Sequence, residues 1–345
     1  MAAALLALAA APGQSVSQAP SRPAWLDPAN WSNVHPVEAD NIVYANVPLI
    51  PNPSADPDPG TPRGIREPLP NTALPGTKDL HVDVFQMPSD KPTPVVVQLH
   101  GGGWIRGDRP NSYTSFRALL AAGMSVVTIE YRNAKDAPAP AAIEDTRCAM
   151  AWVKRNAAKY KFDSNRVILY GGSAGGHLVL MGAYAPDTFT PAGCKDQPKV
   201  VAVLDFYGPT NLAEGLFQHG STDFTHQWLA MDLPLPPDRS VATTDRRPPR
   251  RWPEPDAKTL ARAKEMSPLT YVRQGLPPTF IVHGDSDRTV DPSQSAELKK
   301  ALDAAGVPNG QDIVPGGGHG NFSPAESDKA MVLCLEFLRT HGALP

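Results

Sequence analysis

The strongest constraint on the fold is a serine set between glycines directly after an apolar run. The run Val167–Tyr170 is followed by Gly171-Gly172-Ser173-Ala174-Gly175, and a helix-forming segment, Ala174–Ala185, begins at once. A strand that turns this sharply into a helix holds its serine in a strained conformation and leaves no room for side chains two positions before and after it. The pattern therefore predicts a nucleophile elbow with Ser173 at a helix N-terminus, where the helix dipole favours negative charge.

A second glycine motif supplies what a nucleophilic serine needs. His100-Gly101-Gly102-Gly103-Trp104 follows the buried-type strand Pro94–Leu99. A glycine run lets backbone N–H groups approach a negatively charged oxygen closely. We predict that the N–H groups of Gly102, Gly103 and Ala174 form an oxyanion hole. A flexible turn after a strand is the alternative interpretation.

An acid and a base follow the serine in the order expected for this architecture. The strand Thr279–Val282 leads into a loop that carries Asp285 and Asp287, and the strand Gln311–Val314 leads into a glycine-rich loop that carries His319. His319 is the predicted base. The spacing alone leaves both aspartates open as the acid, because a two-residue offset within a loop is not resolved by sequence.

Other polar and aromatic residues near these motifs have simpler interpretations. His177 lies one helical turn beyond Ser173, which favours a packed helix residue. His100 and His283 stand at loop and strand ends and are expected to orient their loops by hydrogen bonds and not to transfer protons. Tyr207 follows the apolar strand Val200–Phe206, where it either lines a pocket or is a half-buried aromatic.

Together, the segments HGGGW, YRN, GGSAGGHL, HGDSDRTV and GGGHG resemble the α/β-hydrolase superfamily. The set is similar to the esterase/lipase branch related to hormone-sensitive lipase and to bacterial acetyl-esterase and feruloyl-esterase-like enzymes. The resemblance extends from Lys78 to the C-terminus. It implies that Ser173 is the nucleophile, that Asp287, four residues after His283, is the acid, and that His319 is the base.

The chain departs from this family pattern at two places. Gly172 stands where the hormone-sensitive-lipase branch often has an acidic residue, and Val290-Asp291-Pro292 replaces the usual valine-proline pair. Neither departure affects the three predicted catalytic residues.

From Lys78 onward, strand and helix patterns alternate, which favours an α/β fold with a mostly parallel twisted sheet and helices on both faces. Right-handed crossovers would place all four motif loops at one edge of that sheet. The segment Asp79–Phe85 alternates apolar and polar residues and is predicted to be an edge strand. Further helices are predicted at Tyr113–Ala122, Ala141–Ala158, Ser293–Ala305 and Pro324–Thr340, and a further strand at Ser125–Glu130.

Three segments lie outside this alternation. Residues 1–19 are predicted to be a signal peptide, and residues 20–77 an N-terminal arm with a loop, Pro48–Pro75, that holds nine prolines. Residues 78–345 form the predicted catalytic domain. Within it, residues 214–255 interrupt the alternation of strands and helices. They are predicted to be a small cap over the substrate pocket, with an inert surface insertion as the alternative. The aromatic residues of this insertion include Phe217, Phe224, Trp228 and Trp252.

Composition narrows the range of partners. The chain has 345 residues and a net charge of −3, which gives no general reason to bind nucleic acid. No Cys-x-x-Cys pair or His-Glu-x-x-His helix is present, so neither a metal site nor a cofactor is expected. The three cysteines, Cys148, Cys194 and Cys334, allow one disulfide and require none. The apolar leader is too short to span a membrane.

These observations predict a serine carboxylic-ester hydrolase that works through an acyl-enzyme and needs no cofactor. Its substrate would be a small-molecule or oligosaccharide ester with a short-chain or carbohydrate-linked acyl group, contacted by Trp104 and Tyr207. An arylformamidase and a peptidase on the same fold are alternatives, and a catalytically silent binding protein is an alternative of another class.

Export is the first testable expectation. Met1–Ala11 is apolar and is followed by small residues ending at Ala19, although no Lys or Arg precedes it, so an alanine-rich cytosolic tail is the alternative. Mass spectrometry of protein purified from its native host should give an N-terminus near Pro20. An intact Met1 in a cytosolic fraction would contradict export.

Overall fold

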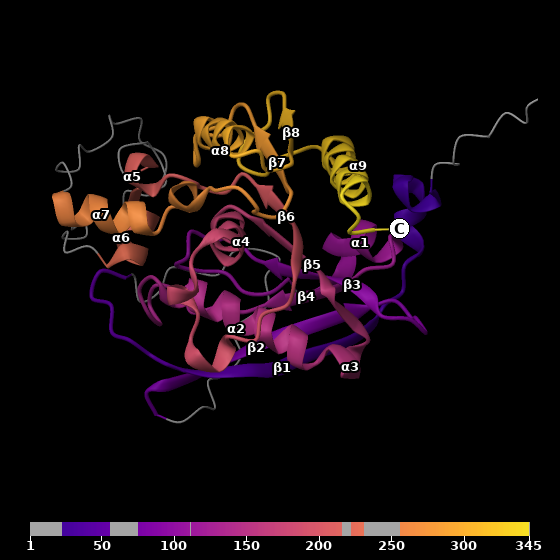
Figure 1. Ribbon diagram of the computed structural model, residues 1–345, viewed down its shortest axis with the longest axis horizontal. Helices are drawn as coiled ribbons and strands as arrows, with labels where there is room; N and C mark the ends of the chain where they lie inside the picture. Colours follow the sequence, from indigo (N-terminus) through magenta and orange to yellow (C-terminus); the bar gives the residue numbers. More distant parts are fainter. Residues whose placement is uncertain (1–22, 56–74, 111, 216–221, 231–255, 345) are drawn as a thin grey trace, which may run out of the picture.

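A computed structural model describes residues 23–55, 75–110, 112–215, 222–230 and 256–344 of the protein. Within these residues one eight-stranded sheet runs in the order β1-β2-β4-β3-β5-β6-β7-β8 (Figure 1). The pairs from β4 to β8 are parallel, so the predicted mostly parallel α/β architecture is confirmed. The strands are β1 Val37–Pro48, β2 Thr77–Gln86, β3 Thr93–Leu99, β4 Ser125–Ile129, β5 Phe162–Gly172, β6 Val200–Phe206, β7 Thr279–Gly284 and β8 Asn309–Val314.

The sheet is covered on both faces because its central strands are apolar on both sides. Along β3, Val95, Val97 and Leu99 enter one hydrophobic core, and Val96 enters the other. Helices α2 Ala141–Arg155, α4 Ala174–Tyr184 and α8 Ser293–Ala304 contribute to the first core. Helices α1 Arg117–Ala121 and α9 Pro324–Thr340 contribute to the second, together with buried Leu26 and Trp31 near the start of the described chain. Such two-sided burial explains why the strands are nearly continuous apolar runs.

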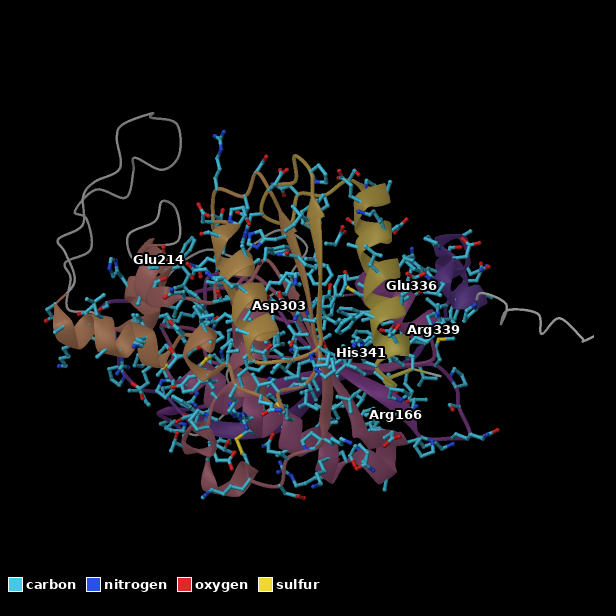
Figure 2. All side chains as sticks on the ribbon, turned by 45° about the horizontal axis from the view of Figure 1, so that its top comes forward. Arg166, Glu214, Asp303, Glu336, Arg339 and His341 are labelled. Atoms are coloured by element: carbon cyan, nitrogen blue, oxygen red, sulfur yellow. A yellow bond between two sulfur atoms is a disulfide. The ribbon has the colours of Figure 1, made fainter. Side chains whose placement is uncertain are left out.

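The remaining helical elements are short or lie at the periphery. Figure 1 shows α5, α6 and α7 gathered at the side of the molecule away from α9. Charged side chains such as Glu214 of α5, Asp303 of α8 and Arg339 of α9 are exposed (Figure 2). These elements are α3 Ala157–Tyr160, α5 Leu212–Gly215, α6 Thr222–Leu229, α7 Ala257–Glu265 and the 3-10 helices Ala24–Leu26, Pro28–Asn33, Tyr113–Phe116, Asp187–Phe189, Ala192–Cys194 and Pro268–Tyr271.

The prediction that Asp79–Phe85 is an edge strand is wrong. β2 lies inside the sheet, paired antiparallel with β4 on one side and with β1 on the other, and β1 is the edge. The alternation that suggested an edge came from Asp83, which is a buried charge paired with Arg109 at 2.8 Å. β1 escaped prediction because its pairing with β2 is irregular and most of its residues are not buried.

Predicted helix boundaries agree with the structure within a few residues. The segment predicted at Tyr113–Ala122 is a 3-10 turn followed by α1, and the one predicted at Ala141–Ala158 is divided into α2 and α3 at Asn156. The Asn156 N–H still donates to Trp152 O at 3.0 Å, but its φ of −101° and ψ of 9° leave the helical region, which ends the regular helix there.

Several predicted segments lie largely outside the described residues. These are the leader at residues 1–19, most of the proline-rich loop, and residues 216–221 and 231–255 of the insertion, including Phe217 and Trp252. In the described part of the chain, no helix is both long and apolar enough to cross a bilayer.

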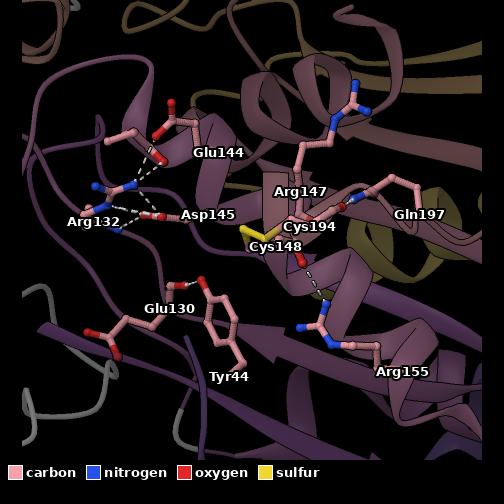
Figure 3. The surroundings of a disulfide bond; sticks show 12 residues. Tyr44, Glu130, Arg132, Glu144, Asp145, Arg147, Cys148, Arg155, Cys194 and Gln197 are labelled. Carbon is pink, nitrogen blue, oxygen red and sulfur yellow. Dashed lines mark hydrogen bonds and ion pairs between the residues drawn. A yellow bond between two sulfur atoms is a disulfide. The ribbon is translucent and has the colours of Figure 1, made fainter. Parts of the chain in front are cut away.

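A disulfide joins Cys148 of α2 to Cys194 of the 3-10 helix Ala192–Cys194 (Figure 3). The Gln197 side chain donates to backbone carbonyl oxygens of Arg147 and Cys194, so the two linked segments are also held by hydrogen bonds. Cys334 of α9 is buried and free. The bond closes a loop across 46 residues of sequence and ties α2 to the segment after α4.

Two measurements test the disulfide: the number of free thiols and the free energy of unfolding. Unfolded but unreduced protein should titrate as one thiol, that of Cys334. The double variant Cys148→Ser/Cys194→Ser should lose roughly 2–4 kcal/mol of unfolding free energy in denaturant melts, because its unfolded chain is less constrained. As a control, reductant should no longer change the denaturant melt of this double variant. Three thiols in unreduced protein would contradict the bond.

Candidate active site

Ser173 stands at the turn from β5 into α4 with φ of 57° and ψ of −125°, a strained conformation for a residue with a side chain. Two contacts hold it there. Its backbone N–H donates to Phe206 O at 2.8 Å, and its carbonyl oxygen accepts from His177 N at 3.0 Å. A side chain at Gly171 would approach Gly175 O to 2.4 Å, and one at Gly175 would approach Leu99 O to 2.2 Å. The predicted steric reason for both glycines is therefore present.

The structure brings Ser173, His319 and Asp287 into one hydrogen-bonded chain. The Ser173 hydroxyl donates to His319 Nε2 at 2.8 Å, and His319 Nδ1 donates to Asp287 Oδ2 at 2.7 Å. With its hydrogen on Nδ1, the imidazole faces the hydroxyl with the lone pair of Nε2, which can accept the hydroxyl proton. The two residues come from loops after β8 and β7, which end at the same edge of the sheet as β5.

Asp285, the alternative acid, has a different position. It is exposed, and its Oδ1 accepts the N–H of Gly316 at 2.7 Å. Its own backbone N–H donates to Val314 O at 3.1 Å. Asp285 therefore ties the start of the histidine loop to the end of β7 and does not contact the imidazole.

The Asp287 carboxylate is buried and yet stays charged. Burial alone would raise its pKa, but hydrogen bonds from His283 and His319, the attraction of His319 and the Thr289 N–H together hold that pKa well below its ordinary value. Its Oδ1 accepts the N–H groups of Thr289 at 2.8 Å and Val290 at 3.1 Å. A fixed negative charge beside Nδ1 would stabilise an imidazolium if His319 took a proton.

The glycine loop after β3 lies against the serine. Gly102 and Gly103 have φ of +120° and +63°, and both line a cavity of about 480 Å³ together with Ser173, Ala174 and His319. Among the described residues, the N–H groups of Gly102 and Gly103 make no hydrogen bond. Ala174 is the first residue of α4, so its N–H has no acceptor within the helix. These three donors are the ones that the sequence predicts for an oxyanion.

Trp104 also lines this cavity. Only 2% of its surface is exposed, its Nε1 donates to His177 Nδ1 at 3.2 Å, and its ring stacks on Trp228 of α6 with centroids 4.8 Å apart. His177 is fully buried and donates from Nε2 to Met266 O at 2.7 Å, which fits the packed role predicted for it.

Tyr207 is another lining residue of the cavity. Its ring centroid lies 4.8 Å from that of His319, and its backbone has φ of 44°. Burial, together with the charges of Asp287 and Asp205, raises the pKa of its phenol to about 12, so the side chain stays neutral. It also lines a second cavity, of about 460 Å³, on the α1 and α9 side.

Sequence reasoning missed several cavity residues that neighbour its motifs. Arg106 lies three residues after Gly103, with its guanidinium 6.0 Å from the ring of Phe224. A cation so close to a glycine loop is the signal that could have identified it. Gln98, at the end of β3, also lines the cavity, and its Oε1 is buried with no partner among the described residues.

The BD-FAE family profile matches residues 82–302. Among curated proteins, the chain is 29% identical to esterase LipQ of Mycobacterium tuberculosis over 239 residues, which cover 68% of this chain and 52% of LipQ. It is 36% identical to carboxylesterase NlhH of Mycobacterium tuberculosis over 239 residues, which cover 67% of this chain and 68% of NlhH. The chain thus spans about half the length of LipQ.

A similar fold occurs in the butyrate-bound structure of the thermophilic esterase Est2 from Thermogutta terrifontis. That comparison has a TM-score of 0.57 and 26% identity, and covers 77% of this chain and 91% of the other. The sheet and its helical layers therefore have a counterpart in a solved α/β-hydrolase esterase.

A second buried carboxyl, Asp205, lies at the end of β6. Burial raises its pKa to about 7, and the attraction of His283 and the N–H of Gly208 offset only part of that rise. Its Oδ1 accepts from Gly208 N at 3.1 Å, whereas its Oδ2 has no partner among the described residues. The folded protein therefore holds a proton on Asp205 more tightly than the unfolded chain does.

The pH dependence of stability should report this proton. Because the folded pKa exceeds the unfolded value of 3.8, the stabilisation is complete below about pH 4 and is lost as pH rises through about 7. Between pH 5 and pH 8, wild type should lose roughly 3 kcal/mol more unfolding free energy than Asp205→Asn. Denaturant melts at both pH values measure the difference.

The exposed Asp90→Asn variant is the matched control and should follow wild type. Equal pH slopes for wild type and Asp205→Asn would show that Asp205 is not preferentially protonated in the folded state.

Proposed function

We propose that this chain, which belongs to the BD-FAE family of α/β-hydrolases, hydrolyses carboxylic esters through an acyl-enzyme on Ser173. The observation that carries the proposal is the continuous chain of hydrogen bonds from Ser173 through His319 to a buried, charged Asp287. The related proteins LipQ, an esterase, and NlhH, a carboxylesterase, agree with this reaction.

In the first half-reaction, Ser173 Oγ attacks the ester carbonyl carbon as its proton passes to His319 Nε2. The carbonyl oxygen becomes an oxyanion, which would accept hydrogen bonds from the N–H groups of Gly102, Gly103 and Ala174. The bond from the carbonyl carbon to the alcohol oxygen then breaks. His319 returns its proton to the leaving alcohol, and the acyl group stays on Ser173.

The second half-reaction removes the acyl group with water. His319 Nε2 takes a proton from the water molecule as the water oxygen attacks the acyl carbon. The tetrahedral intermediate collapses by breaking its bond to Ser173 Oγ, which receives the proton from His319. The carboxylic acid leaves, and the enzyme returns to its starting protonation state.

For the substrate, we propose a short acyl group on a small-molecule or carbohydrate alcohol. A cavity of about 480 Å³ suits a substrate of modest size, and the related esterase Est2 has been solved with butyrate bound. Trp104 and Tyr207 would contact it. Phe224 belongs to the predicted cap, residues 214–255, and lines this cavity, which supports a role of that segment in substrate selection.

Two substitutions separate this mechanism from a silent scaffold. Ser173→Ala should fold normally and lose nearly all hydrolysis of an activated butyrate ester, because no other group can form the acyl-enzyme. Asp287→Asn should lower kcat by a factor on the order of 10⁴, as in the comparable serine-protease substitution, because the amide favours the wrong imidazole tautomer. Initial-rate kinetics measure both.

Asp285→Asn is the control for the acid, since its carboxylate only ties two loops together and should cost far less than Asp287→Asn. Ordinary turnover by Ser173→Ala would reject the mechanism. Rates for N-formylkynurenine and a peptide, compared with those for acetyl and butyryl esters, distinguish the ester hydrolase from an arylformamidase and a peptidase.

A further inference from the structure

His283 is a fully buried side chain at the end of β7 that the proposed reaction does not use. Its Nε2 lies 3.1 Å from Val290 O and 3.2 Å from Asp287 Oδ2. A carbonyl oxygen and a carboxylate oxygen only accept hydrogen bonds, so Nε2 must carry a hydrogen. On the other side of the ring, Nδ1 lies 2.6 Å from the hydroxyl of Ser295 in α8. The ring is therefore held at both nitrogens.

These contacts leave the Asp287 carboxylate no freedom to turn. Its Oδ2 accepts the N–H of His319 Nδ1 at 2.7 Å and lies 3.2 Å from His283 Nε2, whose single hydrogen it shares with Val290 O at 3.1 Å. Its Oδ1 takes the backbone N–H groups of Thr289 and Val290. Rotation of the carboxylate would break hydrogen bonds to a buried charge, which are among the strongest in proteins.

The same ring connects the three segments that place the acid. β7 carries His283, the loop after it carries Asp287 and returns to His283 through the Val290 carbonyl oxygen, and α8 supplies Ser295. The loop thus closes on the ring of His283, and Asp287 is presented to His319 from that closed loop.

We propose that His283 is a positioning residue for catalysis, which orients the Asp287 carboxylate toward His319 by donating from Nε2. The proposal rests on the proposed function, since it gives His283 a role only through the triad. His283 touches neither Ser173 nor the cavity that Ser173 faces.

Two variants of similar length separate the hydrogen bond from packing. His283→Met fills the site without a donor, and His283→Gln restores an N–H donor near the position of Nε2. Loss of a hydrogen bond to a charged group should lower kcat by roughly 30-fold in His283→Met, the factor that about 2 kcal/mol produces. His283→Gln should recover most of that loss, and KM for a butyrate ester should stay within roughly 2-fold in both.

A double-mutant cycle with Asp287→Ala gives the readout that a merely structural role would not move. If His283 acts through Asp287, His283→Met should lower kcat by less than roughly 2-fold in the Asp287→Ala background, where the carboxylate is absent. Should the Met variant fail to fold, Ser295→Ala serves the same cycle, because it only frees Nδ1 of the ring. We expect a smaller loss of kcat in Ser295→Ala, which should also vanish beside Asp287→Ala.

The proposal would be overturned if His283→Met lowered kcat by the same factor with and without Asp287. It would also be overturned if the single variant His283→Met kept the wild-type kcat. The two proposals can fail separately. Full activity in Asp287→Ala would contradict the proposed function, whereas a crippled Asp287→Ala beside a fully active His283→Met would contradict the positioning role alone.

Discussion

The strained backbone at Ser173 is the constraint on which the rest of the site depends. A residue with φ of 57° at the β5–α4 turn is tolerated because the surrounding backbone fixes it: Phe206 O accepts its N–H, and Gly171 and Gly175 stand two residues before and after it. That conformation lifts the hydroxyl above the sheet edge. Because β7 and β8 end at the same edge of the sheet, the loops that follow them can bring Asp287 and His319 to this hydroxyl.

The proposed reaction depends on a charge that the fold keeps buried. Asp287 is useful to His319 only while it is ionised and correctly oriented, and burial alone would favour the neutral acid. Four N–H donors offset that cost, two from the backbone of its own loop and two from imidazoles. At Asp205, with one backbone donor, burial prevails and raises the pKa to about 7. Asp205 therefore has fewer N–H donors than Asp287, and burial dominates its pKa.

Sequence predicted the parts of the fold whose signals are local. The elbow carries its own steric signature, and α9 begins and ends where predicted because Pro324 follows a Ser323 N-cap that forms a capping box with Glu326. Non-local features were beyond it. The outer strand β1 shows no clean alternation, the pairing of Cys148 with Cys194 depends on how α2 packs, and the choice between Asp285 and Asp287 rests on which carboxylate faces inward.

In the proposed reaction Ser173 becomes covalently acylated, and a fluorophosphonate probes this step because it traps the attacking serine. Intact protein at neutral pH should gain one phosphonyl group, and peptide mapping should place it on Ser173. Denatured protein, in which His319 no longer contacts the hydroxyl, should gain none. An adduct on another residue, or no adduct on folded protein, would contradict the account.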